Sequence, residues 1–159
     1  MLIFIKEKLV VFSIPRTGST SLHKALRPFA DIEFSNPPTK KHMNVRRFDR
    51  WALENHRRFL RFTRVAVMRE PLARMASWYA YRRRDAVRGS SASTRGMTFD
   101  QFIEGALSDT PTPATNIGNQ HHFVTREDGS LGIHELFCIE KPEVMLAFFE
   151  KRFGPLTFP

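Results

Sequence analysis

The segment from Leu9 to Leu26, LVVFSIPRTGSTSLHKAL, constrains the fold more than any other part of the chain. An apolar run with the length of a buried strand is followed by a proline and a glycine, and then by apolar residues at helical spacing. A strand, a tight loop and a helix in this order aim backbone N–H groups and the positive end of a helix dipole at one point. Arg16 adds a positive charge there. The segment therefore predicts a site for a phosphate-type anion.

The loop in this segment differs from the G-x-x-x-x-G-K-[ST] loop of nucleoside triphosphatases. Gly18 is its only glycine, and no lysine follows it. The sequence thus gives no reason to expect magnesium-dependent chemistry on a nucleoside triphosphate. On its own, the string Pro-Arg-Thr-Gly fits an ordinary strand-to-helix turn as well as it fits an anion site.

The charge of the chain points to a polyanionic partner. The 159 residues are 42% hydrophobic, which suits a single globular domain over residues 1–159. The net charge is +9, and 15 of the 25 lysines and arginines lie between Lys40 and Arg88. Such an imbalance favours a nucleotide with several phosphates, an acidic glycan, nucleic acid or an anionic membrane surface, and charge alone does not choose among them.

The single cysteine and the hydropathy pattern limit the class of protein. Cys138 cannot form an internal disulfide, and its apolar surroundings predict a buried, inert thiol. No stretch is long enough to span a membrane. The apolar start of the chain is interrupted by charges at residues 6–8, unlike a signal peptide, so a cytoplasmic protein is expected.

A second strand-to-helix junction follows at Arg64 to Pro71. The run RVAVMRE predicts a buried strand, and Pro71 suits the first turn of a helix. Strands and helices alternate along the chain, which predicts a three-layer α/β domain with a mainly parallel central sheet flanked by helices. Right-handed crossovers would then bring the loops at Pro15 and Arg69 to the carboxyl edge of the sheet.

Shorter patterns complete the expected elements. The helix over 44–62 is rich in arginine, which is typical of a solvated face, and no DNA- or RNA-binding signature accompanies it. The other expected elements are an edge strand near Ile32 and Phe34, a helix capped by Thr98 and Gln101, a small hairpin over 123–133, a strand over 136–139 and a helix from Pro142.

Two segments together resemble the nucleotide-binding signatures of a known family. The first is PRTGSTSL, at 15–22, and the second is RxPxxRxxSxY, at 69–79. They are similar to the 5′-phosphosulfate loop and the 3′-phosphate site of sulfotransferases that use 3′-phosphoadenosine 5′-phosphosulfate (PAPS). The resemblance covers Leu9 to about Gly154, in the manner of carbohydrate sulfotransferases and small bacterial relatives. It implies a P-loop-like fold and sulfuryl transfer to a hydroxyl of a small molecule or glycan.

The resemblance also implies roles for individual residues. Arg69 and Ser77 would hold the 3′-phosphate. Arg16 stands where the family usually has lysine; it keeps the charge, but a guanidinium is a planar fork and not a point charge, which alters its role at the bridging oxygen. The residues expected to bind the 5′-phosphosulfate through backbone and hydroxyl groups are Arg16, Thr17, Gly18, Ser19, Thr20 and Ser21.

Catalysis in this family is expected to need no metal, because the protein supplies position and positive charge. His42 is the expected base, since relatives with an alcohol acceptor often place a histidine after the second strand, and its positive neighbourhood favours neutral imidazole. Lys41 would supply charge near the leaving group. The alternative is that Lys-Lys-His is a solvated basic turn, and that His121 or His122 acts instead.

Some expectations concern the acceptor and the rival functions. Loops over 82–96 and 108–122 are expected to contact the acceptor, while Gln120 and Glu140 are expected to be structural. Many relatives continue beyond the last helix, so a second subunit could complete the cover over the nucleotide, as in a homodimer. The rivals are a non-catalytic nucleotide- or polyanion-binding protein of the same fold, and a basic nucleic-acid-binding module.

Overall fold

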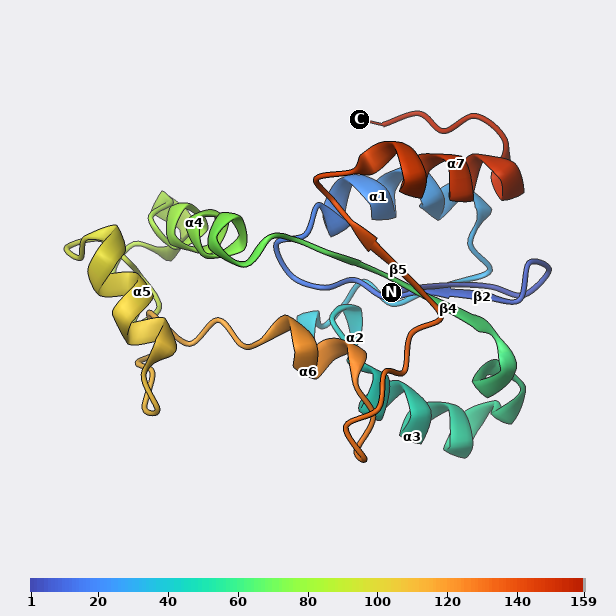
Figure 1. The fold of residues 1–159 in the computed structure, drawn as a ribbon, viewed down its shortest axis with the longest axis horizontal. Coiled ribbons are helices and arrows are strands. Elements are labelled where there is room, and N and C mark those ends of the chain that lie inside the picture. Colours follow the sequence, from blue (N-terminus) through green and yellow to red (C-terminus); the bar gives the residue numbers. More distant parts are fainter. Residues whose placement is uncertain (159) are drawn as a thin grey trace. The chain divides into compact units, whose positions relative to one another are not determined.

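A computed structural model describes residues 1–158, and these fall into two compact units (Figure 1). The first unit comprises residues 1–69 and 120–158, and the second comprises Glu70–Asn119. Within the described residues, none of the helices has both the length and the apolar character that a membrane crossing needs.

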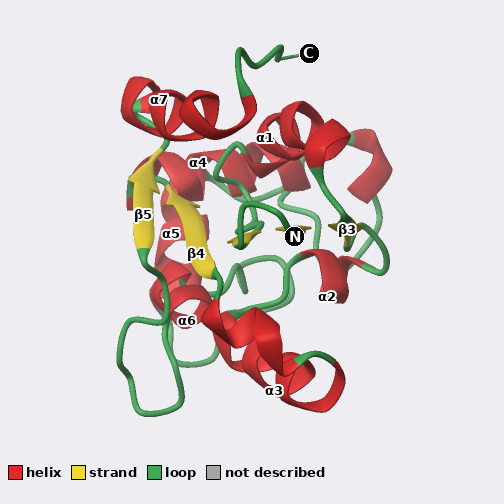
Figure 2. Ribbon diagram, turned by 90° about the vertical axis from the view of Figure 1, so that its right-hand side faces the viewer, coloured by secondary structure: helices red, strands yellow, loops and turns green. Residues whose placement is uncertain are grey.

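The first unit contains a five-stranded sheet with the order β3-β1-β2-β4-β5. β2, β4 and β5 are parallel, and Figure 2 shows β4 and β5 side by side. β1 is antiparallel to both β2 and β3. The strands are β1 (Leu2–Phe4), β2 (Leu9–Val11), β3 (Ile32–Glu33), β4 (Thr63–Met68) and β5 (Glu135–Cys138).

The expectation of a mainly parallel sheet is therefore wrong, because the sheet is mixed. The reason is the start of the chain, where β1 and β2 are joined by a tight turn over residues 5–8. A connection this short can only join antiparallel neighbours. Parallel pairing begins with β2 and β4, which carry the two loops of interest, and these strands do run in the same direction as predicted.

Helices cover both faces of this sheet (Figure 1). Leu9 and Val11 of β2 pack in the cluster that includes residues of α1 and α7, whereas Val10 packs in the cluster that includes residues of α3 and α6. This alternation along one strand gives the three layers that were expected. The helices are α1 (Ser19–Leu26) and α7 (Pro142–Phe153) on one face, and α2 (Pro38–Lys41), α3 (Val45–Asn55) and α6 (Gln120–Val124) on the other.

The arginine-rich helix is shorter than its apolar spacing predicts. Asn44 caps α3 by accepting a hydrogen bond from the Arg47 N–H at 3.0 Å, and Phe48 is fully buried. At His56 the backbone leaves the helical region, with φ −150° and ψ 80°, and a 3-10 helix follows at Arg57–Arg61. The expected helix over 44–62 is thus two helices separated by one non-helical residue.

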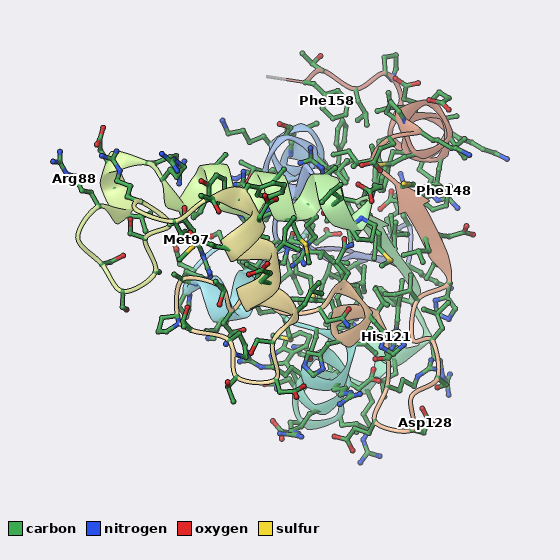
Figure 3. All side chains as sticks on the ribbon, turned by 60° about the vertical axis from the view of Figure 1, so that its left-hand side comes forward. Arg88, Met97, His121, Asp128, Phe148 and Phe158 are labelled. Atoms are coloured by element: carbon green, nitrogen blue, oxygen red, sulfur yellow. The ribbon has the colours of Figure 1, made fainter. Side chains whose placement is uncertain are left out.

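Cys138 is exposed, so the expectation of a buried thiol is wrong. β5 lies at the edge of the sheet, and its residues alternate between two faces. Phe137 packs against Phe148 of α7 with ring centroids 5.1 Å apart, which leaves Leu136 and Cys138 on the outer face. Phe148 is labelled in Figure 3. The Cys138 thiol donates a hydrogen bond of 2.7 Å to Glu140 Oε2, and this bond raises its pKa.

The expected hairpin over 123–133 is reduced to one turn. Residues 120–124 form α6 instead of a strand. Beyond it, a single bridge pairs Thr125 with Leu131, and the Arg126 N–H donates to the Ser130 carbonyl at 2.9 Å. Asp128 lies in this turn (Figure 3).

The second unit is built on α4 (Pro71–Arg82) and α5 (Phe99–Leu107), with a 3-10 helix at Asp85–Val87 between them. The predicted capping box is present, because Thr98 Oγ1 and the Gln101 side chain each accept the other residue's N–H. The ring of Tyr79 packs on Phe102 at 5.5 Å. Arg88 and Met97, labelled in Figure 3, belong to the long loop between the two helices.

One ion pair attaches α3 to the sheet and gives a test of the fold. The Arg64 side chain on β4 is only 3% exposed, and its guanidinium donates to Asp49 Oδ1 on α3. Asp49→Asn should lower the free energy of unfolding by about 2–4 kcal/mol, because it leaves a buried cation without its counter-charge. Glu127→Gln breaks the exposed pair with Arg50 and should cost under about 0.5 kcal/mol. Urea denaturation compares them, and equal losses would contradict the structural role of the buried pair.

Candidate functional site

The loop between β2 and α1 has an unusual backbone. Arg16 and Gly18 both have left-handed dihedral angles, with φ 68° and φ 72°. Between them Thr17 is buried, and its hydroxyl donates to the Ile14 carbonyl at 3.0 Å. A non-glycine residue in this region costs free energy, and such strain is characteristic of ligand-binding loops. The strand-loop-helix order predicted from the sequence is therefore present, with the loop held in a defined shape.

The first turn of α1 is suited to an anion. Gly18 occupies the N-cap position and has no side chain that could satisfy the first N–H groups. The first turn contains no acidic residue. Thr20 and Ser21 are exposed, whereas Ser19 is buried. The helix dipole and two accessible hydroxyl groups thus lie at the end of the loop.

Arg69 lies next to this loop. It follows β4 directly, and because β2 and β4 are parallel neighbours, the chain leaves both strands at the same edge of the sheet. Arg69 Nη1 donates to the carbonyl oxygen of Arg16 at 3.5 Å. The structure therefore brings Arg69, the first residue of the RxPxxRxxSxY segment, next to the loop that contains Arg16.

One N–H group of the Arg69 guanidinium has no hydrogen-bond acceptor within the described residues. This group is the buried Nε–H. Glu140 Oε1 lies 3.9 Å from this Nε, which is an ion pair but too long for a hydrogen bond. A buried N–H without an acceptor costs free energy, and an anion bound between Arg69 and the loop would relieve that cost.

His42 is tied to the same edge of the sheet. It ends α2, and its ring Nδ1 lies 2.6 Å from the carbonyl oxygen of Ser13, just beyond β2. A carbonyl only accepts, so Nδ1 carries the proton and donates, and Nε2 of the neutral ring keeps its lone pair. Burial lowers the pKa of His42, outweighing the opposite effect of the Ser13 bond, and the charge of Lys41 lowers it further. The histidine can thus accept a proton near neutral pH.

The other candidates for a base differ in their surroundings. His121 and His122 lie on α6. His121 is labelled in Figure 3. Asn44 Nδ2 donates to His122 Nε2 at 3.0 Å, because Asn44 Oδ1 already accepts from Arg47. The Nε2 lone pair of His122 is therefore engaged within the fold.

The remaining predicted residues are placed as follows. Lys41 is half-buried at the end of α2, and its neighbour Lys40 is exposed. Ser77 lies on α4, in the second unit, and its part in a 3′-phosphate site stays a prediction. Among the residues described, no three His, Cys, Asp or Glu side chains are grouped as metal ligands would be.

Gly18 provides a test of the loop geometry. A Cβ at this position would overlap with Cδ1 of Ile139, which is the far end of a flexible side chain and can turn away at a small cost. With the positive φ, Gly18→Ala should therefore lower the free energy of unfolding by about 1–2 kcal/mol. Gly129 has φ 82° with nothing near its would-be Cβ, and Gly129→Ala should cost about 1 kcal/mol, from the backbone alone. Chemical denaturation measures both, and a Gly18→Ala loss no larger than the control's would argue against the close contact.

Comparison with known proteins identifies the family to which the chain belongs. A family model described as the sulfotransferase family matches residues 1–138, which include the loop, His42, Arg69 and all five strands. Searches against curated proteins and against solved structures gave no significant match. The match covers most of the chain, and the chain belongs to the sulfotransferase family.

Proposed function

We propose that the protein transfers a sulfuryl group from PAPS to a hydroxyl group of a small molecule or glycan. Membership of the sulfotransferase family supports a transferase. The observation that carries the proposal is the approach of Arg69 to the loop at Arg16, with Nη1 3.5 Å from the Arg16 carbonyl and a buried Nε that lacks a hydrogen-bond acceptor. The loop at Arg16 and the guanidinium of Arg69, on one edge of the sheet, suit a ligand with phosphate groups at two positions.

The loop would hold the sulfonated end of the donor. Backbone N–H groups over residues 16–21, with the hydroxyls of Thr20 and Ser21, would donate to the 5′-phosphosulfate. Arg16 would offset the charge that develops on the leaving phosphate oxygen. Arg69 would donate to the 3′-phosphate.

The reaction needs one bond to form and one to break. The acceptor oxygen would attack sulfur in line, as the bond between sulfur and the 5′-phosphate oxygen breaks. The electron pair of that bond stays on the phosphate, giving adenosine 3′,5′-bisphosphate and a sulfate ester. The hydroxyl proton would pass to Nε2 of His42, whose Nδ1 is held by Ser13. Lys41, adjacent in sequence, would add positive charge.

A thermal unfolding assay tests donor recognition. At 100 times its dissociation constant, a ligand that binds only the folded state adds about 2.7 kcal/mol. For a chain of this size, that corresponds to a rise in melting temperature of about 5–10 °C with adenosine 3′,5′-bisphosphate. Adenosine 5′-monophosphate lacks the 3′-phosphate and should raise it less at the same concentration.

Further assays separate this proposal from its rivals. Incubation with PAPS and a panel of alcohols and glycans should add the mass of one sulfuryl group to an acceptor, with release of the bisphosphate. Stabilisation by the bisphosphate without transfer to any acceptor would indicate a non-catalytic binding protein. Binding to duplex DNA with a steep salt dependence, and no effect of the bisphosphate, would contradict the proposal and favour a nucleic-acid-binding module.

A further inference from the structure

Arg69 is the first residue after β4, which ends at Met68. The last ladder hydrogen bond beside it runs from the Ile139 N–H to the Met68 carbonyl at 2.9 Å. Beyond that bond, none of the strands in residues 1–158 fixes the backbone of Arg69. The peptide groups on either side of Arg69 nevertheless decide where its side chain begins, and hence whether its guanidinium reaches the loop at Arg16.

The side chain of Gln120 takes the place of the missing strand neighbour. Gln120 Oε1 accepts the Arg69 backbone N–H at 3.0 Å, and Gln120 Nε2 donates to the Arg69 carbonyl at 2.8 Å. Because the backbone supplies one donor and one acceptor, only this orientation of the amide satisfies both bonds. Gln120 is 7% exposed. Water is therefore a poor substitute for its two bonds.

Gln120 is itself held in place by the rest of α6. The carbonyl of Val124, at the other end of the helix, accepts the Gly132 N–H at 2.7 Å, and Val124 is buried in the core. His122 accepts a hydrogen bond from Asn44, which is two residues beyond His42. A five-residue helix thus contacts the backbone of Arg69 at one end and the segment following His42 along its side.

We propose that Gln120 is a positioning residue, which fixes the backbone of Arg69 so that the guanidinium faces the loop between β2 and α1. This role rests on the proposed function, since it concerns the arginine that would bind the donor. Gln120 itself need not touch the nucleotide. Its amide affects nucleotide binding only through the position of Arg69. The same helix, α6, also contacts Asn44 in the segment after His42, so both segments are held by one element.

Gln120→Met tests this role, because it keeps the length of the side chain and removes both hydrogen bonds. We expect the affinity for adenosine 3′,5′-bisphosphate, measured by calorimetry, to fall by about tenfold, since small misplacements of a binding group have large effects. In a protein that already carries Arg69→Ala, the same substitution should cause no further loss. Such non-additivity is the signature of two residues that act through one another.

Thr125→Val is the matched control. Thr125 is 2% exposed, and its hydroxyl donates to the His121 carbonyl at 3.0 Å, so the substitution weakens the same segment without a contact to Arg69. It should leave nucleotide affinity within about twofold. Equal losses in Thr125→Val and Gln120→Met, or a full additional loss in the Arg69→Ala background, would mean that Gln120 only stabilises the fold.

A direct readout keeps this inference separate from the donor assignment. In the wild type the Arg69 amide hydrogen should exchange slowly with solvent, and Gln120→Met should speed this exchange selectively, whether or not nucleotide is present. A wild type that does not bind the bisphosphate would overturn the proposed function. A wild type that binds, with unchanged affinity and Arg69 exchange in Gln120→Met, would overturn only the role of Gln120.

Discussion

Replacing His42 with glutamine should lower the rate of sulfuryl transfer by about 10²- to 10⁴-fold, the usual contribution of a positioned general base. Nδ1 of His42 donates to the Ser13 carbonyl at 2.6 Å, so the ring presents its basic nitrogen in a fixed orientation. Glutamine fills a similar volume but does not take up a proton. The measurement is release of adenosine 3′,5′-bisphosphate in the presence of whichever acceptor of the panel gives turnover.

The affinity for the bisphosphate distinguishes lost chemistry from lost structure. It should change less than about twofold in His42→Gln, because the base acts on the acceptor and not on the donor. His121→Gln is the matched control, since His121 is an exposed histidine on α6. A full rate in His42→Gln together with a large loss in His121→Gln would transfer the role of the base to the second histidine.

The same assignment has a pH signature. Burial and the charge of Lys41 lower the pKa of His42 below its usual value of 6.5. A lowered pKa means that half of the imidazole is protonated only at a pH below 6.5, so the midpoint of the decline in rate should lie below 6.5. Lys41→Met removes one of three lowering effects, the others being burial and the nearby N-terminal amine, and should move this decline to higher pH. A decline centred above 6.5 in the wild type would contradict the assignment.

Arg69→Ala should weaken binding of adenosine 3′,5′-bisphosphate by about 10- to 100-fold, as expected for the loss of charge-assisted hydrogen bonds to a phosphate. Its Nη1 lies 3.5 Å from the Arg16 carbonyl, and its buried Nε has no hydrogen-bond partner within the described residues. Arg69→Lys retains the charge without the planar fork, and should recover only part of the affinity. Isothermal titration calorimetry gives both values.

Removing one positive charge outside the loop controls for the effect of the protein's net charge on binding. Arg47 is exposed on α3 and forms no ion pair with any of residues 1–158, so Arg47→Ala removes the same charge. It should alter the affinity by less than about twofold at physiological salt. If Arg47→Ala weakens binding as much as Arg69→Ala, the effect is general electrostatics and Arg69 has no specific role.

The sequence predicts the two strand-to-helix junctions because each has a strong local signal. An apolar run is broken by Pro15 and Gly18 in one, and by Pro71 in the other, and both continue into a helix. Parallel pairing of the two strands then follows from the right-handed crossover rule, and it is confirmed. These local signals suffice to bring Arg69 to the loop at Arg16.

The antiparallel start of the sheet has no comparable signal. β1 has three residues, all of them buried, so no alternation marks it as a strand. Its turn to β2 uses Lys8 at φ 50° in place of the glycine or asparagine that normally indicates a tight hairpin. The prediction of a buried Cys138 is wrong for a related reason, because a four-residue apolar run does not reveal that its strand lies at the edge of the sheet.

The contact of Gln120 with the Arg69 backbone could not be predicted from its sequence context. α6 is too short for helical periodicity, and it contains two histidines that are poor helix formers. Its hydrogen bonds reach Arg69, 51 residues earlier, and Asn44, 78 residues before His122. Contacts over such separations depend on the assembled sheet, so the three-dimensional structure is needed to see that this helix holds both segments.

Nuclear magnetic resonance of the ¹⁵N-labelled protein, titrated with adenosine 3′,5′-bisphosphate, tests most directly whether the loop and Arg69 bind one nucleotide. The amide signals of residues 16–21 and the Nε–H signal of Arg69 should shift together and saturate at the same ligand concentration, as N–H groups do when they donate to phosphate. Binding that leaves these signals in place, or that moves only one of the two groups, would contradict a shared site for the donor.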